Sequence, residues 1–276
     1  MRPLLLLSAL SLSACGPKTT STEANTEPVP VELPQADAIF QAHVDASNQV
    51  GAMTGIETMK VTAVMRIPTA GIEGEILTHW AKPNQILVEQ NIPGIGSGQM
   101  GFDGENGWSS DNMMGPRLME GQELEEALLD SDMMSDINFR EWYTELETLS
   151  QTDFNGVTAY EVKAVARFGR ESTLYFSTES QLQVGASHSV ESPMGPMTME
   201  IFYKEFQDFG GMVVPKLSQV KTGPMTMELE VLSIETNPEI PEGFFVPPAE
   251  IQELLAEQAE TEAATEENSE TSTEEP

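Results

Sequence analysis

The sequence predicts a mainly β fold of the α+β class, with helices inserted once between two runs of strands. Two observations carry this prediction. Apolar and polar residues alternate over many short segments, which is typical of strands that bury one face. Between these segments lie the turn signals of Asp103–Gly107 and of Asn155-Gly156, whose Asp-Gly and Asn-Gly pairs favour hairpins. The 276 residues are enough for one sizeable domain.

The formal net charge of −32 narrows the range of partners. Nucleic-acid phosphates and anionic lipid headgroups attract basic surfaces. We therefore expect no nucleic-acid partner and no general electrostatic binding to anionic membranes. Most of the charge is expected on a solvated surface and in acidic tails.

The N-terminus predicts a signal peptide over residues 1–14. Arg2 is followed by an apolar run, Leu4–Leu12, that is too short to span a bilayer. The run ends in Leu-Ser-Ala before Cys15, which resembles the lipobox of bacterial lipoproteins and implies that Cys15 is lipidated. The alternative is an ordinary secretory signal with a chance cysteine, and the small residues before the only cysteine favour the lipobox.

Residues 15–34 are expected to be the lipidated N-terminus and a disordered tether. This segment is rich in Thr, Glu, Ser and Pro and has no apolar periodicity. Gly16, the residue after the lipidated cysteine, implies the outer membrane, because inner-membrane retention in enterobacterial lipoproteins is associated with Asp at this position.

The next segments predict a helix and then strands. From Ala36, apolar residues recur at helical spacing, and His43 is expected on a face of this helix rather than as a ligand. Alternation then predicts strands over Met59–Ile67, Ile72–Trp80 and Gln85–Ile92.

A glycine-rich segment, Gly96–Gly101, matches the dinucleotide fingerprint G-x-G-x-x-G. The fingerprint requires a following helix, whereas here the hairpin between Phe102 and Trp108 follows. We reject nucleotide binding and expect a turn or bulge at these glycines.

Two helices are predicted in mid-sequence, followed by a second block of strands. Leu124, Ala127 and Leu128 mark the first helix. The second is marked by Phe139, Trp142, Tyr143 and Leu146, with Asp136 as a candidate N-cap. The later strands are expected over Thr148–Phe154, Val157–Val165, Glu171–Ser177, Leu182–Glu191, Met197–Phe206, Met212–Lys221 and Met225–Thr236.

The domain is expected to cover residues 35–248, because Pro247 and Pro248 end ladder pairing. Residues 249–276 are predicted to be an acidic tail. Ile251, Leu254 and Leu255 favour a short helix at its start, and the remainder is expected to be mostly disordered.

A family resemblance rests on two motifs. Phe102-Asp-Gly-x-x-Gly-Trp108, followed by Gly115-Pro-Arg-Leu-Met-Glu-Gly121, resembles bacterial outer-membrane lipoprotein-sorting proteins. These have the fold of the lipoprotein localisation factors LolA and LolB. The resemblance covers Leu33–Pro248 and implies a curved antiparallel half-barrel of about 11 strands, with a few helices as a lid on its concave face.

No catalytic or metal-binding pattern is found. His43, His79 and His188 are scattered and lack metal-ligand spacing, and no metalloprotease or serine-hydrolase motif occurs. We expect no enzymatic activity, no metal and no cofactor.

The candidate ligand-binding residues are the apolar faces of the predicted strands. The chain has 16 methionines, and methionine recurs at surfaces that accept variable apolar partners. The candidates are Met59, Val61, Met65, Ile86, Val88, Met100, Phe102, Trp108, Met197, Met199, Ile201, Met225, Met227 and Leu229. The alternative is that these side chains simply fill a core.

The expected function is therefore non-enzymatic binding of lipid or lipoprotein acyl chains, of the lipoprotein-sorting or lipid-transfer type. The expected location is the periplasmic side of the outer membrane, where Cys15 anchors the chain. An interaction or sensory module that contacts an envelope protein, without a transport role, is the alternative.

Overall fold

The computed structural model describes residues 32–112, 114–190 and 195–271. The chain divides into two units, Met1–Glu32 and Leu33–Pro276, and the elements below all belong to the second, which is compact by itself. The expected signal peptide, lipidated Cys15 and most of the tether lie outside the described residues. Across the described ranges, every helix is too short or too polar to cross a membrane.

One antiparallel sheet of 13 strands forms the framework, with the order β6-β5-β4-β3-β2-β1-β13-β12-β11-β10-β9-β8-β7. Its strands are β1 (Thr58–Ile67), β2 (Ile72–Ala81), β3 (Gln85–Ile92), β4 (Gly96–Phe102), β5 (Gly107–Asp111), β6 (Gly115–Leu118), β7 (Tyr143–Phe154), β8 (Val157–Ala166), β9 (Glu171–Ser177), β10 (Gln183–Val190), β11 (Met197–Phe209), β12 (Met212–Thr222) and β13 (Met225–Thr236). Because β1 pairs with β13, the two halves of the chain meet in the middle of the sheet.

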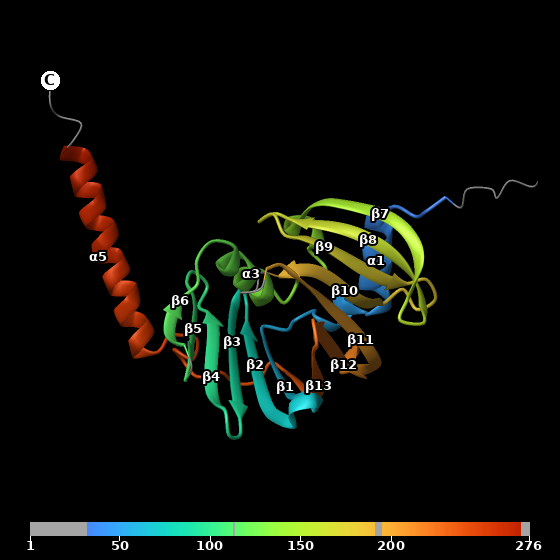
Figure 1. The fold of residues 1–276 in the computed structure, drawn as a ribbon, viewed down its shortest axis with the longest axis horizontal. Coiled ribbons are helices and arrows are strands. Elements are labelled where there is room, and N and C mark those ends of the chain that lie inside the picture. The colour runs from blue at the N-terminus through green and yellow to red at the C-terminus, as the bar shows by residue number, and fades with distance from the viewer. Residues whose placement is uncertain (1–31, 113, 191–194, 272–276) are drawn as a thin grey trace, which may run out of the picture. The chain divides into compact units, whose positions relative to one another are not determined.

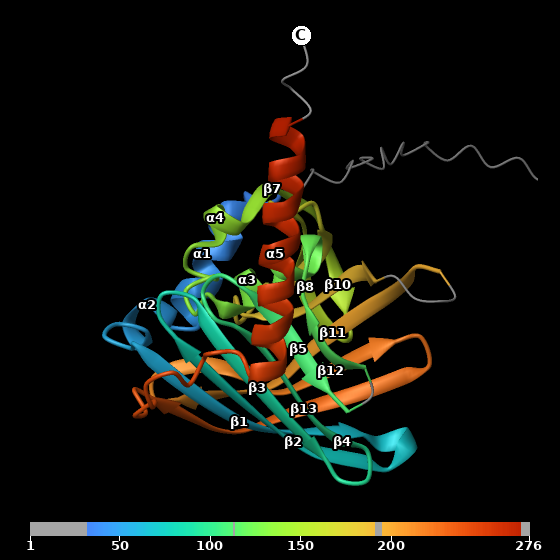
Figure 2. The same cartoon turned by 90° about the vertical axis from the view of Figure 1, so that its left-hand side faces the viewer.

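The helices are short, apart from the last one. They are α1 (Ala36–Ala46), α2 (Gln49–Ala52), η1 (Pro68–Ala70), α3 (Gly121–Ser131), α4 (Phe139–Trp142) and α5 (Ala249–Thr271). The sheet curves, and α1–α4 gather on its concave side (Figures 1 and 2). We call this side the inner face. This is the mainly β fold that alternation predicts, in the curved half-barrel form that the family resemblance implies.

Three apolar clusters pack helices against the inner face. At one end, Phe40 of α1 and Phe139 of α4 pack on Phe176 and its neighbours in β8–β10. In the middle, Met53 and Ile56 pack on Met59 and Met212. At the other end, α3 packs its Leu124, Ala127 and Leu128 on Ile86 and Phe102.

The outer face has apolar clusters only near its two ends, as far as the described residues show. Leu87 and Trp108 lie beneath Phe245 and Ile251 of the C-terminal segment. Phe154 stacks on Tyr175 and Phe202, with ring centroids 3.9 and 5.1 Å apart. A Cβ atom at position 185 would overlap the Phe154 ring, so Gly185 makes this second cluster possible.

The sheet has more strands than the expected 11, because two short strands were not predicted. β6 is only four residues long and contains Pro116, which suits an edge strand because proline lacks an N–H donor. The glycines for which we expected a turn or bulge lie in β4. Gly101 faces Trp108, and a Cβ atom there would lie 2.8 Å from the indole, so glycine is needed for close approach.

The predicted second helix is also shorter than expected. α4 ends at Trp142, and Tyr143 and Leu146 lie in β7, where they pair with Ala166 and Ala164. Asp136 does not cap this helix, whose N-cap position is Asn138.

The C-terminal tail differs from the disordered segment that we expected after a short helix. α5 runs to Thr271. The side chain of Ile251 is fully buried and Leu254 and Leu255 pack beside it. Once this first turn is anchored, the alanines and glutamates that follow favour further helix.

Candidate functional site

The inner face gathers 13 of the 14 candidate residues. Residues paired across neighbouring strands share a face. Register places Val61 beside Thr78, Thr78 beside Val88, and Val88 beside Met100. It likewise places Met65 beside Leu229, and connects Met227 through Val220 to Ile201. Alternation brings Met59, Ile86, Phe102, Met197, Met199 and Met225 to the same face.

Trp108 is the exception, and it lies on the outer face. It pairs with Gly101, whereas Phe102 pairs with Gly107. Successive residues of a strand point to opposite faces, so Trp108 and Phe102 point away from each other. The Trp108 side chain is 1% exposed beneath Phe245 and Ile251. It is a core residue of the outer face.

Helices cover part of the inner-face set. Met59, Ile86 and Phe102 are buried beneath α3 and the segments on either side of it. Val88 is partly buried at the edge of the α3 cluster. These four residues contribute to packed cores.

A second part of the inner face lies outside the helix-covered clusters of the described chain. We call it the inner strip and define it as Val61, Met65, Met199, Ile201, Val220, Met227 and Leu229, from β1 and β11–β13. Met65 is buried, and the other six residues are half-buried. Two candidates outside the strip, Met100 of β4 and Met225 of β13, are 41% and 49% exposed. The strip is a continuous apolar surface that is only partly removed from solvent.

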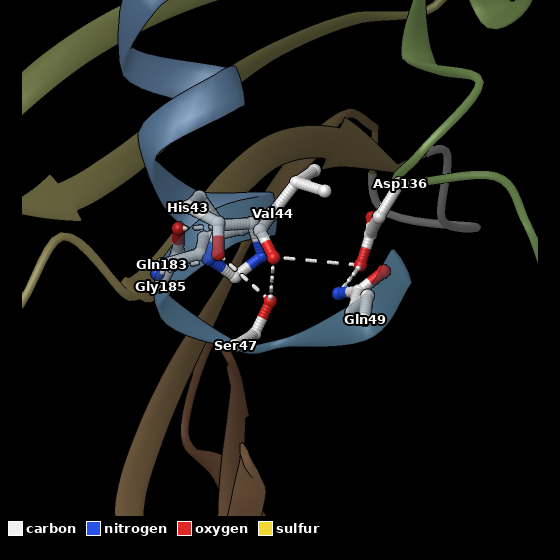
Figure 3. A network of polar contacts seen from close by, with 7 residues as sticks. All are labelled: His43, Val44, Ser47, Gln49, Asp136, Gln183 and Gly185. Carbon is white, nitrogen blue, oxygen red and sulfur yellow. Dashed lines mark hydrogen bonds and ion pairs between the residues drawn. The ribbon is translucent and has the colours of Figure 1, made fainter. Parts of the chain in front are cut away.

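A polar pocket of about 230 Å³ lies on the inner face beside the strip. It is lined by His43, Gln49, Asp136, Gln183, Tyr203, Phe206, Val213, Val214 and Pro215. Figure 3 shows His43 on one side, and Asp136, from the connection between α3 and α4, on the other side with the Gln49 side chain next to it.

Hydrogen bonds fix the walls of this polar pocket. The backbone N–H of Gln183 donates to His43 Nδ1 at 3.2 Å, and Gln49 Nε2 donates to Asp136 Oδ2 at 2.8 Å. His43 Nε2 lies 3.9 Å from the same Asp136 oxygen. Partial desolvation opposes ionisation of the half-exposed Asp136 side chain, but His43 and Gln49 outweigh it and lower the pKa of this carboxyl.

The same residues lack the geometry of a hydrolase. Ser47 lies near His43, but its hydroxyl donates to the backbone carbonyl of His43 at 2.7 Å (Figure 3) and not to the imidazole. A nucleophile needs a hydrogen bond to its general base. The described part of the chain also contains no cluster of three or more His, Cys, Asp or Glu side chains that could hold a metal ion.

A larger hollow, of about 740 Å³, lies on the outer side between β2–β6 and the start of α5. Its lining is mostly carboxylates, amides and small polar residues, including Glu75, Glu89 and Glu250. Apolar ligands need apolar walls. This hollow therefore does not suit an acyl chain, and the inner strip does.

Comparisons with known proteins show the fold. Neither a family model nor a curated protein matches this chain. Among solved structures, it is similar to a DUF1329 family protein of Desulfovibrio piger, with a TM-score of 0.54 and 10% identity over 77% of this chain and 98% of that one. A LolA superfamily protein of Nitrosomonas europaea has a TM-score of 0.52 and 12% identity over 78% and 99% of the two chains.

A third similar structure is a domain assigned to the outer membrane lipoprotein-sorting proteins of Vibrio parahaemolyticus. Its TM-score is 0.51, with 8% identity over 76% of this chain and 97% of that domain. At such identities the likeness establishes a LolA-like fold and leaves the function to be argued from the site.

Proposed function

We propose that this protein binds the acyl chains of lipids or lipoproteins on the inner strip, without catalysing a reaction. One observation carries the proposal. On the concave side of the sheet, methionines and aliphatic residues form a continuous surface outside the helix-covered clusters of the described chain.

The chemistry of the inner strip fits a flexible apolar ligand. Its methionine side chains are unbranched and polarizable, so they adapt to chains of different shape. Concave apolar surfaces are the usual binding sites for such ligands. The outer face of the same strands is charged, as in the pairs of Lys60 with Glu235 and Arg66 with Glu230, and would repel an acyl chain.

The proposal includes the location of the protein. The sequence before the tether supports lipidation at Cys15, and the LolA-like fold is shared with a lipoprotein-sorting domain. We infer an outer-membrane lipoprotein with its domain in the periplasm. Cys15→Ala should abolish processing of the precursor and membrane fractionation. Unchanged mass and fractionation would refute this part of the proposal.

The binding proposal is tested with a matched pair of arginine substitutions. Met227→Arg places a charge within the inner strip, whereas Gln219→Arg places one on the outer face beside Glu228, to which Gln219 already donates. The chain from Gly16 to Pro276 retains the entire compact unit and can be titrated with an environment-sensitive fluorescent fatty acid. We expect Met227→Arg to abolish binding and Gln219→Arg to preserve it.

A chain that never binds such a fatty acid would refute the proposal. Co-purification of a protein partner without lipid, shown by lipid extraction and mass spectrometry, would then favour the interaction or sensory module.

A further inference from the structure

The polar pocket and the inner strip are continuous through Tyr203. Tyr203 lines the pocket and pairs with Ser218, which in turn pairs with Leu229 of the strip. Ile201 lies two residues earlier on the same face of β11. The inner face therefore has a polar end and an apolar length, as an amphiphilic ligand does.

Polar groups at this end have hydrogen-bonding capacity that the described residues do not use. Asp136 accepts its hydrogen bond from Gln49 through Oδ2 alone, and its side chain is 51% exposed. The hydroxyl of Tyr203 makes no hydrogen bond to another described residue, although this side chain is half-buried. Enclosed tyrosine hydroxyls usually have a hydrogen-bond partner, so this end is suited to receive a polar group.

The local charge is negative. Burial raises the pKa of Tyr203, and Asp136 and Asp130 raise it further, which shows that both carboxylates act on this phenol. Arg170 is the cation that lowers the pKa of Asp130. Its guanidinium already forms an ion pair with Glu126, at 3.1 Å. His43 Nδ1 accepts a hydrogen bond from the backbone N–H of Gln183, and His43 Nε2 lies 3.9 Å from Asp136 Oδ2.

We propose that the polar pocket binds a protonated amine at the head of the amphiphile whose chain lies on the inner strip. The carboxylate of Asp136 pairs with the ammonium group, and the face of Tyr203 adds a cation–π contact. A carboxylate or bare phosphate at the same place would be repelled. This inference rests on the proposed function and names its ligand class as amine-bearing amphiphiles.

The experiment compares two competitors that share a chain length and differ in head charge. Dodecylammonium and dodecanoate, each below its micelle concentration, displace the neutral probe N-phenyl-1-naphthylamine from the chain Gly16 to Pro276 at neutral pH. We expect dodecylammonium to compete at a roughly tenfold lower concentration. Asp136→Asn, which preserves an acceptor for Gln49, should remove most of this preference, and Tyr203→Phe should reduce it.

The control variant is Glu200→Gln. Glu200 is an exposed residue on the same strand as Tyr203 but on the outer face, where it pairs with Lys221. Glu200→Gln removes one negative charge from the molecule, as Asp136→Asn does. An equal loss of preference in the two variants would assign the effect to the net charge and overturn the pocket proposal.

Each remaining outcome is also decisive. Equal competition by the two amphiphiles overturns the amine proposal while leaving acyl binding intact, and failure of the neutral probe to bind refutes the proposed function itself. If the preference holds, lysophosphatidylethanolamine and lysophosphatidylglycerol of one chain length identify the source. A preference for the first assigns the amine to a phospholipid head, and equal competition assigns it to a simpler amine.

Discussion

Two regions of the inner face differ in how their apolar surface is covered. Over β8–β10, Phe40 of α1 lies 4.8 Å from Phe139 and 5.0 Å from Phe176, measured between ring centroids, and Phe176 is fully buried. Over β11–β13 and β1, the inner strip lies outside the helix-covered clusters described above. Rigid aromatic rings close one region, whereas flexible methionines and aliphatic side chains form the other. We infer that the first holds the fold together and the second meets the ligand.

The largest expected effect comes from truncating one large apolar side chain to alanine in each of the two regions. Phe176→Ala should lower the free energy of unfolding by about 3–5 kcal/mol, because it leaves a cavity in a closed core. Met227→Ala, in the partly solvated strip, should cost no more than about 1 kcal/mol. Urea unfolding of both variants measures the difference. Equal costs would mean that the strip is packed as tightly as the aromatic end.

The outer face offers a second contrast, between the buried and exposed parts of α5. Ile251→Ala should cost about 2–5 kcal/mol because the side chain is fully buried beside Trp108 and Phe245. Ending the chain at Ala259 should lower the melting temperature by less than about 2 °C. A larger fall on truncation would show that the acidic part of α5 also docks.

The smallest expected effect concerns Asp130, at the C-terminal end of α3. Burial raises its pKa from 3.8 to about 6, Glu126 adds to the rise and Arg170 opposes it. Between these two values the folded protein binds more protons than the unfolded chain, so stability should fall as the pH rises through this window.

Asp130→Asn should therefore raise the melting temperature slightly at pH 7.5 and leave it nearly unchanged at pH 4. Because Asp130 also reaches solvent, the gain should be small. Melting curves at the two values of pH measure it, and a variant that is less stable at pH 7.5 would contradict this assignment.

Alternation predicted most of the inner face, since residues two apart share a face whatever the register. Thus Met197, Met199 and Ile201 remain together in β11. Which way Trp108 points depends on the length of the hairpin loop. Phe102 pairs with Gly107 across four loop residues. Trp108, one residue later, therefore points to the face opposite that of Phe102. Two aromatics that flank a turn do not reveal this by themselves.

Tertiary packing decided the elements that local sequence predicted less well. Tyr143 and Leu146 fit helical spacing with Phe139 and Trp142, yet pairing with β8 makes them part of a strand. The polar pocket also escaped prediction, because His43, Asp136 and Tyr203 meet only after α1, the α3–α4 connection and β11 are brought together. Three such separated residues share no sequence pattern.

The central claim, that acyl chains lie on the inner strip, is tested most directly by photo-crosslinking. A fatty acid with a diazirine on its chain would be irradiated with the chain Gly16 to Pro276, and the modified peptides would be mapped by mass spectrometry. The account predicts adducts on β11–β13 at Met199, Met227 or Leu229, and none at Phe176 or Trp108, which are closed within cores. Adducts confined to the outer face, or none above the level of a Met227→Arg control, would contradict it.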